Sequence, residues 1–430
     1  MLFSSKLFEQ PFNFKTMSNK YNFDFLAAVE RIKNVVNRTP LQYNARLSEK
    51  YDCQVYLKRE DLQTVRSYKL RGAYNMMSQI PAEQIQNGIV CASAGNHAQG
   101  VAYSCKKLKI KGTIFMPEIT PKQKVSQTTL FGDGWINIVL VGDTFDDCLA
   151  EALHFTEENK MTFVPPFDHY HVIEGQGTVG VEILEDLPNT EVVIMPIGGG
   201  GLASGAGTYL KETNPNILLI GVEPEGAPSM EAAFKAGRPI KLDQINRFID
   251  GAAVKSVGLL TYPICKEVLD EILLIPEGKV CTSILKLYNE DAIVAEPAGA
   301  LAVASLDLCA SQIKGKKVVC IVSGGNNDIE RMQEIKEKSL LFEGLKHYFI
   351  VRFPQRPGAL KVFVNDVLGP HDDITRFEFI KKTERESGPA LVGIELKDRE
   401  DYAGLVERMK AFKFEIIELN QDQTLFEYLV

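Results

Sequence analysis

The chain has 430 residues, a length that predicts two or three domains, and 45% of them are hydrophobic, enough for a large core. Its 48 basic and 56 acidic residues give a net charge of −8, so there is no global positive field to attract nucleic acid or an anionic membrane. No uncharged apolar run reaches the ~18 residues needed to cross a bilayer. Composition therefore argues against disordered, membrane-spanning and polyanion-binding proteins.

The eight cysteines are scattered along the chain and include no C-x-x-C pair. Several lie in apolar runs such as 318–322, which is typical of buried free thiols in a reducing compartment. Residues 1–20 lack the apolar core of a secretory signal, so we interpret them as an N-terminal tail, with Met17 as an alternative start. These features predict a cytoplasmic protein.

Residues 21–335 alternate short runs rich in β-branched residues with longer amphipathic segments. Helices are expected between the runs, for example over 145–159 and 283–289. Strands that are apolar on both faces and joined by helical crossovers predict a parallel α/β sheet. The runs predicted as strands are 54–57, 89–92, 112–116, 136–141, 192–197, 218–222 and 317–322.

A charged, weakly apolar segment at 336–345 interrupts this pattern, and we interpret it as a linker. The remaining residues, 346–430, show a different order of elements. They predict a strand, a helix, two strands, a helix and a strand, the order of the ferredoxin-like fold. The predicted ranges are 348–353, 356–368, 373–382, 390–396, 400–412 and 415–419.

The glycine-rich segment 198–205 follows a predicted strand and opens a predicted helix. Glycines let successive N–H groups approach an anion, and a helix N-terminus adds partial positive charge, so the segment predicts a phosphate site. The spacing Gly198-x-Gly200-x-x-Ala203 also fits the dinucleotide fingerprint, with Glu223 placed as a ribose-binding acid. The residues alone leave both kinds of ligand open. A P-loop is excluded because no Lys-Ser/Thr pair follows the glycines.

Lys69 lies near the start of a helix predicted to begin at 64–67, with a Ser or Thr as its cap. The helix dipole and the charges of Arg66 and Arg71 disfavour its ammonium form, and burial would act in the same direction. A lysine that gives up its proton easily is what a Schiff-base nucleophile requires. The alternative is a solvated lysine on a helix face, and the residues alone favour it.

Two further segments follow predicted strands, namely 93–97 and 323–326. The first combines small residues with a glycine, a pattern that can form an amide nest for a carboxylate. Within it, Asn96 can donate to an aromatic hydroxyl or accept from an imine, and His97 is either a general base or a residue that orients the loop backbone. The C-terminal ends of parallel strands are where ligands bind, so we expect these segments to share one site.

Taken in order, these segments resemble the fold-type II pyridoxal-phosphate enzymes, a tryptophan synthase β-like fold, and most closely the threonine deaminases, also called threonine dehydratases or ammonia-lyases. The tail resembles the regulatory ACT-like domain of the biosynthetic members, at 349–360 and 373–377, and only one such module fits. The resemblance implies a two-lobed α/β body, with the smaller lobe at about residues 65–160, and a ferredoxin-like α+β regulatory domain. It covers roughly residues 25–330 and rests on 58–72, 93–100, 175–178, 198–202, 221–224, 296–300 and 323–326.

The resemblance implies a role for each motif. Lys69 would form the Schiff base with pyridoxal 5′-phosphate and serve as the catalytic base, Asn96 would contact the cofactor's 3′-oxygen, and Ser323 its pyridine nitrogen. A neutral hydroxyl at that nitrogen does not force its protonation, which suits β-elimination. The cofactor phosphate would be held by Gly198, Gly199, Gly200, Gly201 and Leu202, and the substrate carboxylate by Ser93, Ala94, Gly95, Asn96 and His97.

The implied reaction converts L-threonine to 2-oxobutanoate and ammonia in the first step of isoleucine biosynthesis, with L-serine as a further substrate. Isoleucine, and as a second candidate valine, would be effectors of a homotetramer. Two positions depart from relatives in the family. Ala94 replaces the Ser of serine racemases, which favours a lyase. Ser229 replaces an acid that would complete a cation site with Glu223 and Ala227, so no metal is expected.

Three alternatives stay open. A degradative L-serine/L-threonine dehydratase would use the same chemistry but does not explain the regulatory tail. A nicotinamide-dependent oxidoreductase would use the glycine loop and Glu223, and would leave Lys69 and Asn96 unexplained. A non-enzymatic amino-acid sensor built on the tail would leave most of the chain without a role.

Overall fold

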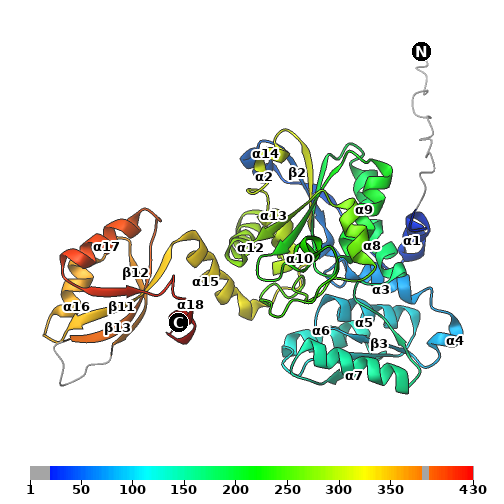
Figure 1. Cartoon of the computed structure of the whole chain (residues 1–430), viewed down its shortest axis with the longest axis horizontal. Coiled ribbons are helices and arrows are strands. Elements are labelled where there is room, and N and C mark those ends of the chain that lie inside the picture. Colours follow the sequence, from blue (N-terminus) through cyan, green and yellow to red (C-terminus); the bar gives the residue numbers. More distant parts are fainter. Residues whose placement is uncertain (1–19, 380–386, 430) are drawn as a thin grey trace, which may run out of the picture.

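The computed structural model describes residues 20–379 and 387–429, which form a two-lobed body and a separate C-terminal domain joined to it by one helix (Figure 1). The large lobe is built on a six-stranded sheet of order β1-β2-β10-β7-β8-β9, in which β1 is antiparallel and the other strands are parallel. Its strands are β1 Leu41–Tyr43, β2 Gln54–Arg59, β7 Val192–Pro196, β8 Leu218–Pro224, β9 Glu271–Ile275 and β10 Lys317–Val322.

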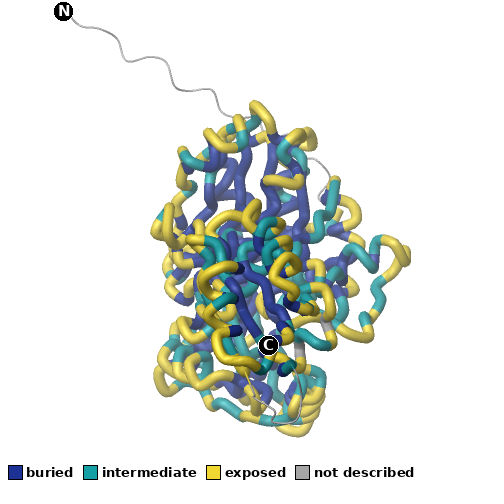
Figure 2. The backbone as a smooth tube through the Cα atoms, turned by 90° about the vertical axis from the view of Figure 1, so that its left-hand side faces the viewer, coloured by how far each residue is buried: buried dark blue, intermediate teal, exposed yellow. Residues whose placement is uncertain are grey.

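The central strands of this sheet are buried on both faces, which explains their unbroken apolar sequences. Side chains alternate between two cores: Val318 and Cys320 pack into the core on one face, whereas Val319 and Ile321 pack into the core on the other. Figure 2 shows these strands as a buried interior surrounded by exposed helix surfaces. The helices of this lobe are α1 Phe25–Ile32, α2 Ala45–Tyr51, α8 Tyr170–Asp186, α9 Gly201–Thr213, α10 Ser229–Ala236, α11 Thr261–Val268, α12 Glu277–Asp291, α13 Pro297–Ala304 and α14 Ala310–Ile313.

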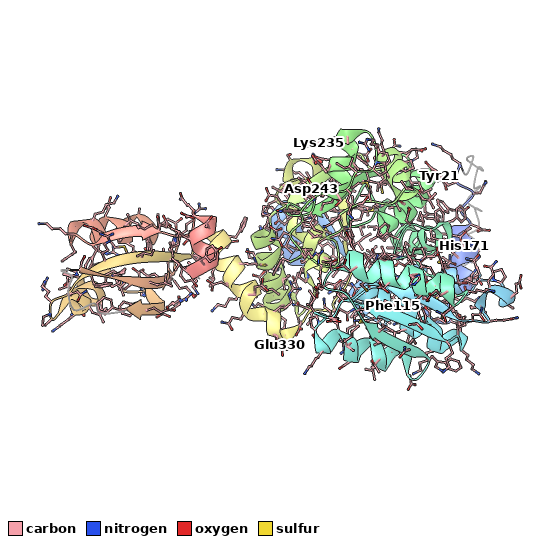
Figure 3. The ribbon with its side chains drawn as sticks, turned by 60° about the horizontal axis from the view of Figure 1, so that its bottom comes forward. Tyr21, Phe115, His171, Lys235, Asp243 and Glu330 are labelled. Atoms are coloured by element: carbon pink, nitrogen blue, oxygen red, sulfur yellow. The ribbon has the colours of Figure 1, made fainter. Side chains whose placement is uncertain are left out.

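The small lobe holds a second parallel sheet of order β5-β4-β3-β6. Its strands are β3 Ile89–Ala92, β4 Gly112–Met116, β5 Ile136–Leu140 and β6 Thr162–Phe163. Phe115, labelled in Figure 3, lies on β4 in the middle of this lobe. Its helices, together with the 3-10 turn η1 that precedes them, are η1 Glu60–Leu62, α3 Lys69–Met77, α4 Ala82–Ile85, α5 Asn96–Leu108, α6 Lys122–Gly132 and α7 Phe145–Glu158.

The parallel α/β prediction is confirmed, and the strands predicted at 89–92, 112–116 and 317–322 have the predicted bounds. Three short strands, β1, β6 and β9, were not predicted. They were missed because two of them, β1 and β6, have only two or three residues, too few for a hydrophobic period, and because β9 is half-buried at the sheet edge. No described helix is long and apolar enough to span a bilayer.

The segment 336–345, expected as a linker, is helical over most of its length. It belongs to α15, Met332–Glu343, which follows the short 3-10 turn η2, Ile329–Arg331, close to Glu330 in Figure 3. Ile335 is fully buried in the core of the body, and the hydroxyls of Ser339 and Thr282 lie 2.9 Å apart, which ties α15 to α12. The sequence pattern is weak because this helix buries only Ile335 and Ser339, one turn apart.

The C-terminal domain has the predicted β-α-β-β-α-β order in an antiparallel sheet arranged β12-β13-β11-β14. Two details differ from the prediction. The single helix expected at 356–368 is a short α-helix that widens into a π-helix, and a final helix, α18, was not predicted. The predicted strand 373–382 is seen as β12, and its residues 380–382 lie outside the described residues. The elements are β11 Lys346–Pro354, α16 Ala359–Val362, η3 Phe363–Val367, β12 Asp373–Phe379, β13 Ser387–Glu395, α17 Asp401–Ala411, β14 Glu415–Glu418 and α18 Gln423–Leu429.

If α15 is an integral part of the catalytic body, truncating Ile335 to Ala should lower the free energy of unfolding by about 2–5 kcal/mol, because it opens a cavity in a packed core. The exposed neighbour Lys336→Ala is the matched control and should change it by less than about 0.5 kcal/mol. Urea unfolding followed by circular dichroism measures both. Equal effects of the two substitutions would contradict the packing described.

Candidate active site

Lys69 is the first residue of α3, and the turn before it is fastened to the end of β10. Ser67 forms an isolated antiparallel bridge with Gly324, and the N–H of Tyr68 donates to the Ser323 carbonyl at 3.1 Å. Two segments far apart in sequence are thereby held together, so Lys69 is fixed at the C-terminal end of the central strand.

The predicted start of this helix, at 64–67 with a Ser or Thr cap, is wrong. The residue before the helix is Tyr68, and no side chain caps it. Arg66 has a φ of +57°, which a right-handed helix cannot contain, and Ser67 is used in the bridge to β10. Tertiary pairing therefore outweighs the local capping preference.

The environment of Lys69 favours its neutral amine. Burial lowers its pKa to about 8, although the nearby Glu296 carboxylate opposes the shift. Its Nζ donates to the carbonyl of Pro166 at 3.0 Å, so the amine contacts the protein interior and is not a solvated surface group. A lysine with such a pKa is a competent nucleophile near neutral pH.

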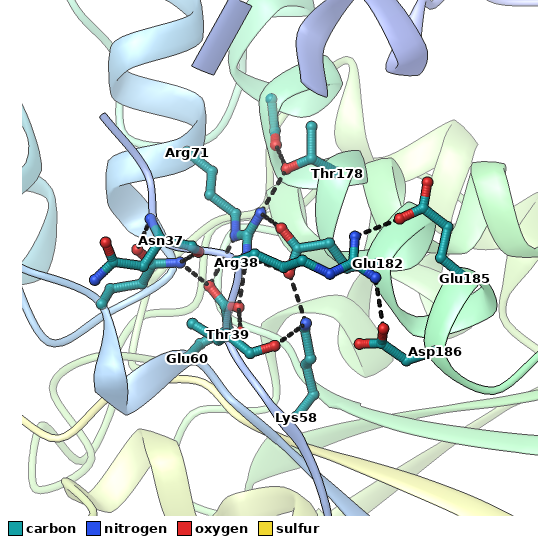
Figure 4. A network of polar contacts seen from close by, with 12 residues as sticks. Asn37, Arg38, Thr39, Lys58, Glu60, Arg71, Thr178, Glu182, Glu185 and Asp186 are labelled. Carbon is teal, nitrogen blue, oxygen red and sulfur yellow. Dashed lines mark hydrogen bonds and ion pairs between the residues drawn. The ribbon is translucent and has the colours of Figure 1, made fainter. Parts of the chain in front are cut away.

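A network of buried charges holds α3 in place (Figure 4). Arg71, two residues after Lys69, is fully buried and makes two hydrogen bonds of 2.8 Å to Glu60. It makes two more, of 2.7 and 2.9 Å, to Glu182 on α8, which also accepts from Lys58 at 2.6 Å. Two cations thus meet two anions, and although burial opposes it, Arg71 lowers the pKa of Glu60.

The segment 93–97 runs from the end of β3 into the first turn of α5. Gly95 precedes the first residue of α5, and a side chain added to it would meet nothing within 4 Å, so open space faces this helix start. The Gly95 N–H donates to the Ser93 hydroxyl at 3.2 Å, which shapes the turn. The N–H groups of Asn96 and His97, in the first turn of α5, have no acceptor within the helix, and such groups can hold a carboxylate.

His97 lies in this loop but is not placed as a base. Its Nε2 lies 2.8 Å from the Val164 carbonyl, and burial, with the charge of Lys69, lowers its pKa to about 3. A neutral imidazole with one nitrogen committed to a carbonyl fixes backbone geometry. Of the two roles considered for His97, the structure favours that of orienting the loop.

The glycine loop approaches its neighbours so closely that side chains would not fit. A Cβ on Gly199 would lie 2.3 Å from the ring of Phe167, and Gly200 has a φ of +93°. The Thr261 hydroxyl donates to the Gly199 carbonyl at 2.6 Å. Because α9 begins at Gly201 and no side chain caps it, the N–H groups of its first turn have no acceptor within the helix, as is typical of helix starts that bind anions.

Asp168 stabilises the segment 259–261, which contacts the glycine loop through Thr261. Its carboxylate accepts from the N–H groups of Leu259 and Leu260, both at 2.9 Å, and of Thr261 at 3.2 Å. The segment 164–168 therefore contacts His97, Lys69, the glycine loop and the Thr261 loop in turn. This segment was not predicted as functional, because it acts through backbone carbonyls and one ring, which leave no motif in the sequence.

Asn96 and Ser323 complete the set of predicted residues. The Asn96 amide donates to Glu296 at 2.6 Å and accepts from Asn326 at 2.7 Å. Ser323 is buried, and its hydroxyl makes a long hydrogen bond of 3.3 Å to the Ala298 carbonyl, so it remains available to a stronger partner. Glu296 and Asn326 lie in the segments 296–300 and 323–326, whose sequence predicts no role for these two side chains.

Glu223 is fully buried and accepts from the N–H groups of Met230 at 2.7 Å and Glu231 at 2.9 Å. Burial raises its pKa to about 8. Its carboxylate is committed to the start of α10 and is not free for a ribose hydroxyl, which argues against the dinucleotide alternative. Among the described residues there is no cluster of three or more His, Cys, Asp or Glu side chains suited to a metal.

The residues fit pyridoxal phosphate on structural grounds. A buried amine of lowered pKa, a helix start with unpaired N–H groups and a buried hydroxyl are the three kinds of group that its aldehyde, phosphate and ring nitrogen require. They come from α3, α9 and the end of β10, and the segment 164–168 and the bridge to Gly324 hold them in one region.

Comparison with known proteins agrees with this geometry. Residues 32–324 match the family model described as pyridoxal-phosphate dependent enzyme, and residues 337–429 match that of the C-terminal regulatory domain of threonine dehydratase. L-threonine dehydratase biosynthetic IlvA of Bacillus subtilis is 60% identical over 407 residues, 94% of this chain and 96% of that protein. The protein of the same name from Halalkalibacterium halodurans is 56% identical over 408 residues, covering 95% and 98%.

Solved structures show the same similarity. The processed form of threonine deaminase isoform 2 from Solanum lycopersicum has a TM-score of 0.71 at 37% identity, covering 75% of this chain and 94% of that one. A second threonine deaminase, from T.th., has a TM-score of 0.67 at 33% identity, covering 73% and 99%. The chain belongs to the pyridoxal-phosphate-dependent enzymes of fold type II. Within them, it belongs to the family of threonine dehydratases with a C-terminal regulatory domain.

Replacing Arg71 with Met should cost about 3–5 kcal/mol of stability, because Glu60 and Glu182 would then share only one buried cation. Arg38→Met is the control, since Arg38 pairs with Glu185 and Asp186 at the surface and should contribute less than about 1 kcal/mol. Chemical unfolding of both variants tests this. A loss for Arg71→Met no larger than that of the control would show that the network does not hold α3.

Proposed function

We propose that this protein dehydrates and deaminates L-threonine to 2-oxobutanoate and ammonia, the first step of isoleucine biosynthesis, using pyridoxal 5′-phosphate. The observation that carries the proposal is Lys69, a buried lysine with a pKa of about 8, held at the end of β10 by the bridge before it and close enough to His97 for its charge to lower the pKa of that imidazole. Two similar proteins are named biosynthetic, and this chain shares the regulatory domain of the family. Both observations support a biosynthetic role over a degradative one.

Each group of residues has its own task. When bound, the cofactor supplies an electron sink for charge that develops at the substrate's α-carbon. Lys69 holds the cofactor through its amine and, once displaced by the substrate, accepts the α-proton at Nζ. The N–H groups of Gly198, Gly199, Gly200, Gly201 and Leu202 bind the phosphate, and the segment made of Ser93, Ala94, Gly95, Asn96 and His97 holds the substrate carboxylate.

The remaining residues determine the outcome of the reaction. Asn96 donates to the 3′-oxygen of the cofactor, and Ser323 contacts its ring nitrogen without a charge, which favours elimination over transamination. Ala94 has no group that could exchange a proton on the second face of the substrate. The β-hydroxyl would leave as water with a proton that the phosphate of the bound cofactor would supply, and the chemistry is that of a lyase acting on threonine and also on serine.

We assign the catalytic body to residues 21–335, including a smaller lobe at about 65–160, and the regulatory domain to 346–430. The latter would bind isoleucine, and as a second candidate valine, in a homotetramer. A free-energy coupling of about 1–3 kcal/mol between effector and substrate is typical of such control. All eight cysteines are free, in keeping with a reducing cytoplasm as the place of action.

Lys69→Ala should abolish both 2-oxobutanoate formation and the visible absorbance of the bound cofactor, because the amine is the only proposed attachment point. Lys107→Ala, an exposed lysine on α5, should leave both unchanged. Absorbance spectra and a coupled assay for 2-oxobutanoate measure this. Activity and normal absorbance in the Lys69 variant would refute its assignment.

Isoleucine should change the apparent affinity for threonine by about 5–150-fold, as expected for coupling between distinct sites. Initial rates across threonine concentrations, with and without isoleucine or valine, give this factor. L-lysine, which lacks a branched apolar side chain, serves as the control. Rates that respond to neither branched amino acid would argue for the degradative alternative.

A further inference from the structure

One buried carboxylate near Lys69 has no place in the roles described so far. Glu296 precedes α13, is only 6% exposed, and donates its own N–H to the Gly324 carbonyl at 3.1 Å. A Cβ on Gly324 would lie 2.2 Å from Oε1 of Glu296, so only glycine leaves room for the carboxylate here. The chain thus accommodates a buried acid beside the site, although burying a carboxylate costs free energy.

Glu296 is the end of a line of directed hydrogen bonds. The Asn326 amide uses its nitrogen twice, donating to the Val65 carbonyl at 2.9 Å and to Oδ1 of Asn96 at 2.7 Å. Asn96 then donates from Nδ2 to Oε1 of Glu296 at 2.6 Å. Glu296 accepts from the Asn96 nitrogen and Asn326 donates to the Asn96 oxygen, so the two partners together fix which end of the Asn96 amide faces which way.

An amide nitrogen carries two protons, and this line of hydrogen bonds uses one of those on Asn96. We propose that Glu296 and Asn326 are positioning residues that hold the second Asn96 proton ready for the 3′-oxygen of pyridoxal phosphate. The inference rests on the proposed function and deepens it. Without these two partners, the Asn96 amide could rotate and present its oxygen to the cofactor instead. Neither residue touches the cofactor in this role; each acts through Asn96.

The charges around Glu296 agree with a carboxylate tuned to the site. Burial raises its pKa to about 7, and the neighbouring Asp250 acts in the same direction. The hydrogen bond from Asn96, with Lys124 and Arg331, opposes the shift, and these two cations also pair with Asp250. Lys69 and Tyr68 lie close enough for their own pKa values to respond to Glu296.

The test compares Glu296→Gln and Asn326→Asp with a matched control, Glu174→Gln. Glu174 is also buried and also accepts from an asparagine, Asn75, at 3.0 Å, but it lies on α8 away from the predicted cofactor contacts. Equilibrium dialysis gives the dissociation constant of pyridoxal phosphate, and pH titration of the bound cofactor's absorbance reports the state of its 3′-oxygen. Thermal midpoints of the cofactor-free proteins report folding.

Both site variants should bind pyridoxal phosphate about tenfold more weakly, with a shifted absorbance titration, whereas Glu174→Gln should match wild type in both and differ only in thermal midpoint. Wild-type affinity and titration in Glu296→Gln and in Asn326→Asp would overturn the inference, as would equal changes in Glu174→Gln. If the wild-type protein itself forms no absorbance that depends on Lys69, the proposed function fails, and this inference fails with it. That outcome is seen in the wild-type protein, whereas the other outcomes are seen only in the variants.

Discussion

The buried pairing of Arg71 and Lys58 with Glu60 and Glu182 is the interaction on which the site depends (Figure 4). Removing four charges from water costs several kcal/mol per ion, and the pairing repays this only if every partner stays in place. The network therefore tolerates few alternative arrangements of β2, α3 and α8. Because Lys69 lies two residues from Arg71 on the same helix, the network also holds Lys69 in position. A nucleophile that is positioned before the reaction begins is what catalysis requires.

The site handles anions without net positive charge. The chain carries a charge of −8, yet α9 begins at Gly201 and α5 at Asn96 with no side chain capping either helix start. Partial charges at helix ends act only within a turn, so they can bind a phosphate and a carboxylate without attracting larger polyanions. The ammonium form of Lys69 is disfavoured by burial and not by these helix starts, so binding and reactivity rest on different features of the site.

Much of the fold was predictable from sequence because strands that are buried on both faces appear as long apolar runs, as at 317–322. Glycine loops between a strand and a helix can be recognised by the spacing of their glycines. What could not be predicted acts through tertiary contact. The helix carrying Lys69 starts after a bridge to Gly324, and the segment 164–168 works through backbone carbonyls. The burial of α15 rests on two residues, and the contact between Asn96 and Glu296 joins positions 200 apart, which no local pattern encodes.

The central claim is that Lys69 is the residue that holds the cofactor. Reduction of the purified holoenzyme with borohydride, followed by proteolysis and mass spectrometry, locates the lysine that becomes covalently modified. A single reduced pyridoxyl group on Lys69, with loss of the visible absorbance, is the expected result. A modification on another lysine, or an active protein with no modified lysine, would contradict it.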